Sequence, residues 1–246
     1  MQLADNSWTD ARDTETTVAL LPVGSTEQHG PHAPLGVDLH SARAIAEAAA
    51  DRFTESHQRE VAVCPPVPVG VAEEHRAFDG SLWVSEETLR RYVGDILRSL
   101  ASSGLERVVV VNGHGGNTGA LAEICMEVTR AGECYAVPFT WFDVVDSTFD
   151  LGHGGPVETS LMLAIAPELI DEDRYPAAAA GAGAGFGEIV AGSNVAYDFD
   201  EFSEAGNLGD PTPATAEEGQ RLLELSATAC AELLEAVRTR EWAGAD

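Results

Sequence analysis

Short hydrophobic runs alternate with longer segments of helical periodicity along most of this chain. Four of the runs have the length and composition of buried β-strands, at residues 18–23, 61–64, 107–111 and 135–137. The third is apolar throughout its centre, which is typical of a strand covered by helices on both faces.

Between and after these strands, apolar residues recur at helical spacing. The pattern predicts helices at residues 39–53, 85–100, 118–130, 156–167 and 213–238, with Ser85 as the N-cap of the second. Residues 1–16 are predicted to be irregular, and the Ala/Gly-rich stretch 177–187 is predicted to be a flexible loop. The alternation of strand and helix indicates parallel βαβ units in a single α/β domain spanning residues 1–246.

Composition narrows the classes of function. The chain has 246 residues, 44% of them hydrophobic, which suffices for one α/β domain with a substantial core. Only 14 residues are Lys or Arg against 41 Asp or Glu, giving a formal net charge of -27. A field of this sign repels nucleic acid and anionic membranes, so neither is expected as a partner. Because the acidic residues are spread along the chain, we interpret the charge as a halophilic adaptation; an acidic binding surface is the alternative.

The cysteines and the N-terminus indicate a cellular compartment. Cys64, Cys125, Cys134 and Cys230 show no CxxC spacing, so reduced, buried thiols are expected. Residues 1–15 lack the basic and apolar regions of a signal peptide, and no stretch reaches about 18 consecutive apolar residues. The sequence predicts a soluble cytoplasmic protein.

The loop after the first strand contains the densest group of candidate metal ligands. Glu27, His29, His32, Asp38 and His40 lie within 14 positions, in a segment punctuated by glycine and proline. Imidazole and carboxylate are the ligand set of Zn, Mn or Fe(II). Loops at the carboxyl ends of strands form the sites of open α/β sheets. A polar surface loop that happens to contain histidines is the alternative.

The spacing within this loop favours a two-metal site. Glu27 and His29 are two residues apart and would project to the same side of an extended chain. Asp38 follows 11 positions after Glu27, which lets the loop fold back and offer a bridging carboxylate. Two ions about 3.5–4 Å apart activate water and polarise a carbonyl together. One of His32 and His40 is predicted to hydrogen-bond a ligand instead of binding metal.

Three further histidines are candidates for chemistry. His114 follows the third strand within Asn-Gly-His-Gly-Gly-Asn and is interpreted as a metal ligand, because two strands then place ligands at the same sheet edge. A tight turn is the alternative, and a phosphate-binding loop is disfavoured by the missing lysine. His153, in a glycine loop before a predicted helix, is a candidate general acid or base. Glu158, in the first turn of that helix, either binds metal or stabilises the helix dipole. His75, flanked by two glutamates and Arg76, either lines a substrate pocket or lies on the surface.

Taken together, these segments resemble the creatininase (creatinine amidohydrolase) family. The resemblance rests on three motifs that occur in consistent order between about residues 17 and 235: Gly-Ser-Thr-Glu-Gln-His-Gly at 24–30 followed by Pro34 and Asp38, Asn-Gly-His-Gly-Gly-Asn at 112–117, and His153 with Glu-Thr-Ser at 158–160. The first two motifs together are highly specific.

The resemblance implies a fold and a metal site. The expected fold is a three-layer α/β/α arrangement with a mostly parallel central sheet. The expected cofactors are two divalent metal ions (Zn, Fe(II) or Mn). By the family pattern Glu27 and His114 would bind one ion, His29 would bind the other, and Asp38 would bridge them. His153 would be the catalytic histidine.

The resemblance also implies a reaction and partners. The expected enzyme is an amidohydrolase acting on a non-peptide C–N bond of a small amide or formamide. The expected substrate contacts are His75, Arg76, Gly115 and Trp141. The expected assembly is a homo-oligomer, often a hexamer.

The second motif departs from creatininase proper at Gly116, where that enzyme has a glutamate that completes the second metal site. Either Glu158 supplies the missing carboxylate or the second site is weaker. Other family branches with the same Gly-Gly turn are an archaeal formylamino-pyrimidine ribotide deformylase of flavin and deazaflavin synthesis and the peptidase of mycofactocin maturation. The acidic composition favours the deformylase, for whose phosphate Arg76 and Arg43 are the candidate partners.

Two hypotheses about the function follow, one for an enzyme and one for a non-catalytic protein. In the first, a metal-activated water attacks an amide or formamide carbonyl and His153 protonates the leaving nitrogen. In the second, the chain is a non-catalytic binding or assembly subunit, an alternative that Gly116 keeps open. Bound metal separates the two, because an enzyme of this type requires about two equivalents per chain.

Overall fold

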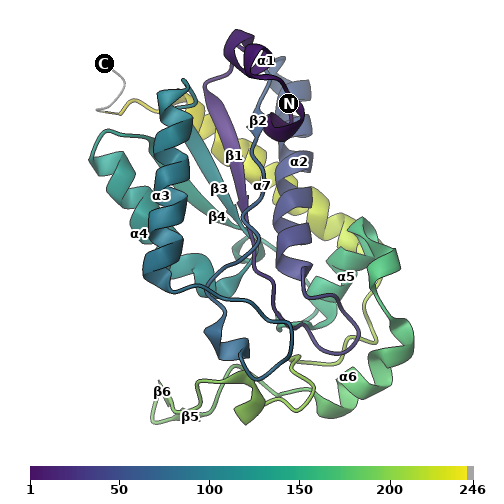
Figure 1. The fold of residues 1–246 in the computed structure, drawn as a ribbon. Helices are drawn as coiled ribbons and strands as arrows, with labels where there is room; N and C mark the ends of the chain where they lie inside the picture. Colours follow the sequence, from purple (N-terminus) through teal and green to yellow (C-terminus); the bar gives the residue numbers. More distant parts are fainter. Residues whose placement is uncertain (243–246) are drawn as a thin grey trace.

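A four-stranded parallel sheet forms the centre of the computed structural model, which describes residues 1–242 (Figure 1). Leu20 pairs with Val109 on the neighbouring strand, and Val109 pairs with Val137 on the next. Because all strands run in one direction, their carboxyl ends meet at one edge, as predicted. The strands, in the spatial order β2-β1-β3-β4, are β1 (Val18–Val23), β2 (Ala62–Val63), β3 (Arg107–Asn112) and β4 (Tyr135–Thr140).

Alternate residues of the strands enter two hydrophobic cores on opposite faces of the sheet. Leu20 and Val109 pack against the helices α2 (Val37–His57), α5 (Pro156–Ile165) and α7 (Ala216–Thr239). Leu21 and Val110 pack against α3 (Glu86–Ser102) and α4 (Thr118–Arg130). Figure 1 shows α3 and α4 on one side of the sheet and α2 with α7 on the other. The predicted three-layer α/β/α fold is confirmed.

Several elements differ from the sequence-based prediction. The helix α1 (Trp8–Asp13) occupies part of the N-terminal segment that was expected to be irregular, and a capping box between Ser7 and Asp10 starts it. The helix α6 (Tyr175–Gly181) occupies the first half of the predicted flexible loop, since its alanines favour helix and Ala178 is buried. The helix α2 begins two residues earlier than predicted, which places Asp38 in its first turn.

A cap covers the carboxyl edge of the sheet. It consists of the loop after β1, the 3₁₀ turns Glu73–His75 and Phe199–Glu201, α6, and a hairpin of β5 (Ile189–Val190) and β6 (Ser193–Asn194) (Figure 1). Loops and turns therefore enclose the sheet edge at which sequence analysis predicts the site.

Away from the site, the cysteines meet the sequence-based expectation. All four cysteines are buried and unpaired, and burial raises the pKa of each thiol to about 12. No helix within residues 1–242 has the length and apolar character needed to cross a membrane.

Candidate metal centre

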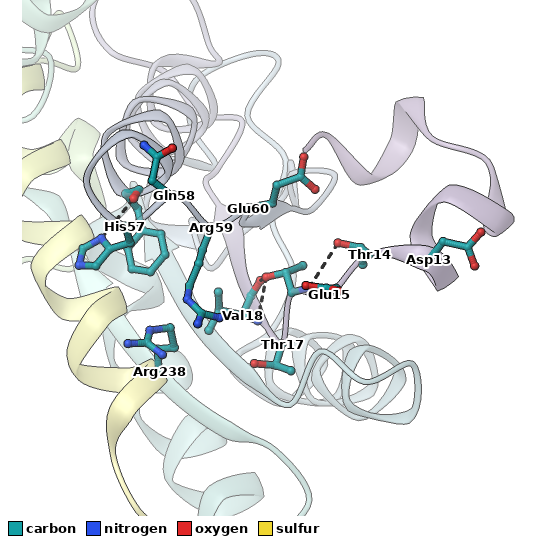
Figure 2. A pocket seen from close by; sticks show the side chains of 12 residues that line it. Asp13, Thr14, Glu15, Thr17, Val18, His57, Gln58, Arg59, Glu60 and Arg238 are labelled. Carbon is teal, nitrogen blue, oxygen red and sulfur yellow. Dashed lines mark hydrogen bonds between the residues drawn. The ribbon is translucent and has the colours of Figure 1, made fainter.

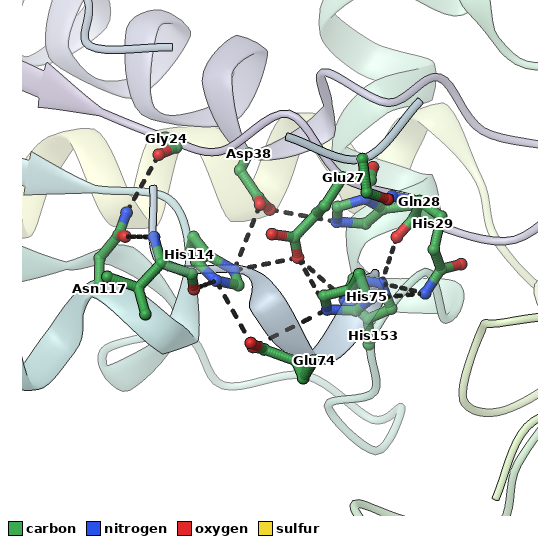
Figure 3. A network of polar contacts seen from close by, with 12 residues as sticks. Gly24, Glu27, Gln28, His29, Asp38, Glu74, His75, His114, Asn117 and His153 are labelled. Atoms are coloured by element: carbon green, nitrogen blue, oxygen red, sulfur yellow. Dashed lines mark hydrogen bonds and ion pairs between the residues drawn. The ribbon is translucent and has the colours of Figure 1, made fainter. Parts of the chain in front are cut away.

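Two strand ends and the first turn of α2 bring four predicted ligands together. Glu27 and His29 come from the loop after β1, His114 follows β3, and Asp38 lies at the start of α2 (Figure 3). All four are buried, and none is more than 6% exposed. The close approach of the loop after β3 to the start of α2 requires Gly113, because a Cβ there would lie 2.2 Å from the carbonyl oxygen of Asp38.

Asp38 lies between two histidines and directs one carboxylate oxygen to each. Its Oδ1 is 3.1 Å from His29 Nε2, and its Oδ2 is 3.4 Å from His114 Nδ1. Glu27 Oε1 lies 3.1 Å from the same His114 nitrogen. This is the arrangement that a carboxylate bridging two ions requires.

Main-chain carbonyl groups orient three of the histidines. In each ring one nitrogen donates to a carbonyl oxygen: His29 Nδ1 to Glu27 (3.1 Å), His114 Nε2 to Val71 (2.7 Å) and His153 Nε2 to Gln28 (2.5 Å). A carbonyl oxygen only accepts, so the other nitrogen of each neutral ring carries a lone pair. For His29 and His114 this second nitrogen faces carboxylate oxygens, so a cation between them could take the place of a proton on the ring.

Three carboxylate oxygens of the cluster lack a hydrogen-bond donor. Both oxygens of Glu27 and Oδ2 of Asp38 are buried without a well-aligned hydrogen bond, although His75 Nε2 lies 3.2 Å from Glu27 Oε1. An uncompensated buried charge costs several kcal/mol. The donor atoms of three sets of residues lie close enough to hold an ion: Glu27, His29 and Asp38; His29, His153 and Glu158; Glu27, His75 and His153. Mixed imidazole and carboxylate donors of this kind fit divalent cations.

Opposite charges shift the pKa values within the cluster. Burial by itself would lower the pKa of His29 and His114, but Asp38 beside His29 and Glu27 beside His114 raise these values to about 9 and about 10. Burial would raise the pKa of Glu27, yet the surrounding histidines, His114 foremost, hold it below its ordinary value. Protons on His29 and His114 thus balance the carboxylates in the metal-free chain, and a metal ion must displace them.

His153 lies between two other imidazole rings of the cluster. Its ring centroid is 4.1 Å from that of His29 and 4.5 Å from that of His75. Burial, together with these neighbours, lowers the pKa of His153 well below its ordinary value. The ring is therefore neutral, with Nε2 protonated and Nδ1 free to accept a proton.

His75 is part of the buried cluster and not a surface residue, since it is 1% exposed. Gln28 Nε2 donates to His75 Nδ1 over 2.8 Å, so the proton of the neutral ring is on Nε2 and faces Glu27. Burial lowers the pKa of His75 to about 4, which keeps the ring neutral. His75 thus turns an N–H, and not a lone pair, towards the cluster.

The helix α5 adds a further carboxylate on the side of His29. Glu158 Oε2 accepts a hydrogen bond from the main-chain nitrogen of Gly154 (2.6 Å) and lies 3.8 Å from His29 Nε2. Burial raises the pKa of Glu158 to about 7. Gly116 has no room for a side chain, because a Cβ there would lie 2.2 Å from the carbonyl oxygen of Val71.

A cleft of about 470 Å³ opens from the cluster. Four aromatic side chains that sequence analysis did not identify form the aromatic wall of the cleft: Phe186, Tyr197, Phe199 and Phe202. No motif marks them, since they come from the segments on either side of the hairpin. The cleft is lined by cluster residues and by others from the cap and strand ends, including Asp38, Glu74, His75, His114, Gly115, Phe142, His153, Glu158, Phe186, Tyr197, Phe199 and Phe202.

The predicted substrate contacts divide into two groups. His75 and Gly115 line the cleft. Trp141 does not: it is 1% exposed and packs in the core on the α2–α7 face. Arg76 is half exposed and pairs with Asp198 at 2.5 Å outside the cleft. One of His32 and His40 was predicted to hydrogen-bond a ligand; His32 hydrogen-bonds Thr159 (2.9 Å), the neighbour of Glu158, and not a proposed ligand itself.

A larger cavity, of about 690 Å³, lies at the opposite edge of the sheet (Figure 2). Val18 at the amino end of β1 lines it, together with His57, Arg59, Glu60 and Arg238. Among residues 1–242, the groups able to hold a metal ion lie at the other edge. Ligands of open parallel sheets bind at the carboxyl ends of the strands, so the smaller cleft is the candidate site.

The fold and the cluster define an α/β/α enzyme domain with the donor set of a divalent-metal site. Residues 4–234 match the creatininase family, described as creatinine amidohydrolase. The chain belongs to this family.

Individual relatives agree with the family assignment. The chain is 36% identical over 230 residues to a mycofactocin precursor peptide peptidase of Mycolicibacterium smegmatis, covering 92% of this chain and 85% of that one. It is 32% identical over 181 residues to a creatinine amidohydrolase of Pseudomonas putida, covering 64% and 67% of the two chains. A solved tryptophan-to-alanine mutant of creatininase superimposes with a TM-score of 0.81 at 26% identity, covering 97% and 99%. These relatives are hydrolases of C–N bonds, and the chain is an enzyme of this class.

Proposed function

We propose that the chain is a metal-dependent hydrolase that cleaves an amide bond in a small, peptide-derived substrate. The observation that carries the metal dependence is Asp38, whose two oxygens face one ring nitrogen each of His29 and His114 in a buried cluster. The peptide-derived substrate is supported by the 36% identity, over 92% of the chain, to a mycofactocin precursor peptide peptidase.

Five residues are proposed to hold the metals. Glu27 and His114 would hold one ion, His29 and Glu158 the other, and Asp38 both. Glu158 thus replaces the carboxylate that Gly116 cannot provide. When bound, two divalent ions lower the pKa of a water molecule and polarise the carbonyl group of the substrate. Zn and Mn are the first metals to test, since related structures are named as a Zn–Zn type creatininase mutant and as creatininase Mn.

The protein's own groups position the substrate and move the proton. His153 Nδ1 carries a lone pair at the cleft and accepts a proton from the attacking water, then passes it to the leaving nitrogen. The carbonyl oxygen of Gln28 keeps the ring in this tautomer. His75 directs its N–H towards Glu27 and so holds that carboxylate in place. The aromatic wall excludes water from the reacting groups.

Other substrates of the family are weaker candidates. Creatinine is the second candidate, because the creatinine amidohydrolase of Pseudomonas putida is 32% identical over a shorter segment. The ribotide deformylase reaction needs a phosphate-binding group. Arg43 pairs with Glu47 on the outer surface of α2, and Arg76 pairs with Asp198. Neither lines the cleft, so we do not retain the preference for the deformylase.

Metal analysis combined with a substrate screen tests the proposal. Metal-depleted protein reloaded with Zn, Mn or Fe(II) is expected to bind about two equivalents and to hydrolyse short peptide amides in preference to creatinine, small formamides and the formylamino-pyrimidine ribotide. Asp38→Ala is expected to abolish both metal binding and turnover. Asp51→Ala, at an exposed position of the same helix, is the control and should retain both.

Two outcomes would contradict the proposal. Near-zero metal in the wild-type protein, with no turnover of any substrate, would favour the non-catalytic binding subunit. Full activity of Asp38→Ala would show that the cluster is not the reaction site.

A further inference from the structure

The charged groups that line the cleft are all acidic or imidazole. Among the described residues that line it, none is an arginine, and the chain contains no lysine. Asp38 and Glu158 belong to the proposed metal cluster. Glu74 is the remaining carboxylate of the lining, and the proposed reaction does not use it.

Glu74 is directed into the cleft. Figure 3 shows it beside His75 and His114, across the cluster from Asp38. Its Oε1 lies 4.0 Å from His75 Nε2 and 3.9 Å from His114 Nε2, at the limit of ion-pair distance. The His114 Nε2 proton is already donated to the carbonyl oxygen of Val71.

Glu74 differs from Glu73, the residue before it, in exposure and in its ion-pair partners. Glu73 is 64% exposed and pairs with Arg76 at 3.5 Å on the outer surface. The side chain of Glu74 is 30% exposed, and within residues 1–242 no arginine lies within ion-pair distance of it. Its carboxylate is therefore available to a positively charged ligand in a partly dehydrated cleft, where such a contact is stronger than in bulk water.

The aromatic wall complements this carboxylate. Phe199 stacks on His75 with a centroid distance of 4.1 Å, and Phe186 meets Phe199 edge to face at 6.2 Å. Phe186 and Tyr197 are 57% and 78% exposed, so much of their ring surface faces solvent. Ring faces attract cations and provide apolar contact for the carbon skeleton next to the charge.

We propose that Glu74 is a specificity-determining residue that binds an ammonium or guanidinium group of the substrate, while the aromatic wall covers the adjoining apolar part. This proposal rests on the proposed function and narrows its substrate class to amides that carry a positive charge near the scissile bond. A phosphate or carboxylate in the same position would meet Glu74 with like charge and no arginine to compensate it.

Binding of two simple probes to the metal-loaded protein tests the proposal. Phenethyltrimethylammonium carries a permanent charge and no lone pair, so it cannot coordinate a metal, and 2-phenylethanol is its neutral counterpart. Titration calorimetry is expected to show that Glu74→Gln binds the ammonium probe about tenfold more weakly, as loss of one partly buried charge contact predicts. The affinity for 2-phenylethanol should change less than about twofold.

Glu73→Gln is the matched control, because it removes the same charge one residue away on the outer surface. It should leave the affinity for both probes unchanged. An equal loss of ammonium binding in both variants would overturn the proposal, since the general field of a chain with net charge -27 would then explain it. A wild-type protein that does not prefer the ammonium probe to the alcohol would overturn it as well.

Metal content distinguishes a role of Glu74 in substrate recognition from a role in supporting the metal cluster. Glu74→Gln is expected to retain the metal content of the wild-type protein, and loss of metal would overturn the proposal by making Glu74 part of the metal site. Because probe binding needs no turnover, failure of this proposal is distinguishable from absence of hydrolysis, which would contradict the proposed function instead.

Discussion

At the scale of single residues, the hydrogen bond on the far side of each imidazole distinguishes its role. In His29 and His114 one ring N–H donates to a main-chain carbonyl oxygen, and the other ring nitrogen faces Asp38 and can offer its lone pair once deprotonated. The amide nitrogen of Gln28 instead donates to His75 Nδ1, so the N–H of His75 faces Glu27. One type of side chain thus serves as proposed ligand in two places and as support in a third.

The proposed role of His153 is tested by substitution. His153→Gln is expected to bind metal as the wild-type protein does but to turn over about 10²–10⁴-fold more slowly, because proton transfer to the leaving nitrogen is lost. Metal analysis and steady-state kinetics measure the two quantities. His57→Gln, at the end of α2, is the control. Loss of metal from His153→Gln would make this residue a ligand, and a full rate would exclude a role in proton transfer.

The acid stability of the fold is expected to depend on His32. Burial lowers the pKa of His32 to about 4, whereas an unfolded chain protonates this ring near 6.5. Between these values the unfolded state binds more protons, so the free energy of unfolding decreases as the pH falls from about 6.5 to 4. Urea denaturation of the metal-free protein across this range should show that His32→Gln loses about 1–3 kcal/mol less than the wild-type protein. Parallel pH profiles of the two proteins would contradict this expectation.

At the scale of elements, close contacts between helices place the site. Pro156 opens α5, and the first turn of that helix carries Glu158. The same helix packs against α7, where Gly219 allows the two backbones to meet: a Cβ at this position would lie 1.8 Å from the carbonyl oxygen of Ser160. The position of Glu158 therefore depends on a contact with a helix about 60 residues further along the chain.

A methyl group at this contact is expected to destabilise the fold. Gly219→Ala should reduce the free energy of unfolding by about 1–3 kcal/mol, because the two helices must separate to accommodate it. Gly119→Ala in α4 has no neighbour within 4 Å and should stabilise by up to about 1 kcal/mol through helix propensity alone. Denaturant titration measures both, and equal effects of the two substitutions would contradict the packing argument.

At the scale of the whole molecule, the net charge of -27 dominates the electrostatics. Like charges repel across the folded surface, and salt confines this repulsion to charges closer than about 10 Å at 0.1 M and about 3 Å at 1 M. We expect the melting temperature to rise by several degrees between 0.05 and about 2 M KCl. Sucrose of equal osmolality controls for general exclusion of solutes. A melting temperature independent of KCl would contradict the salt-adapted interpretation. The acidic binding surface would then be the remaining explanation of the charge.

The homo-oligomer implied by the family resemblance also belongs to this scale and stays a prediction. Light scattering of the metal-loaded protein, compared with the chain mass of 25.9 kDa, measures it. A mass of one chain at micromolar concentration would contradict it.

Local sequence was sufficient for the existence of the four strands of the central sheet, for their parallel direction and for the grouping of Glu27, His29, Asp38 and His114. These follow from hydrophobic periodicity and from motifs directly after strand ends, which any parallel sheet brings to one edge. The N-terminal helix and α6 were missed, because capping and alanine propensity compete weakly with polar or low-complexity composition.

The tertiary structure alone decided which side chains face the cleft. Trp141 follows a strand end as the ligands do, yet it points into the core, and Arg76 next to the buried His75 points to the surface. The position of Glu158, the orientation of Glu74 and the aromatic wall arise from segments that meet only after folding. Sequence thus determined which residues reach the carboxyl edge of the sheet, because that depends on order along the chain. Their direction at that edge depends on packing between distant segments, which spacing does not encode.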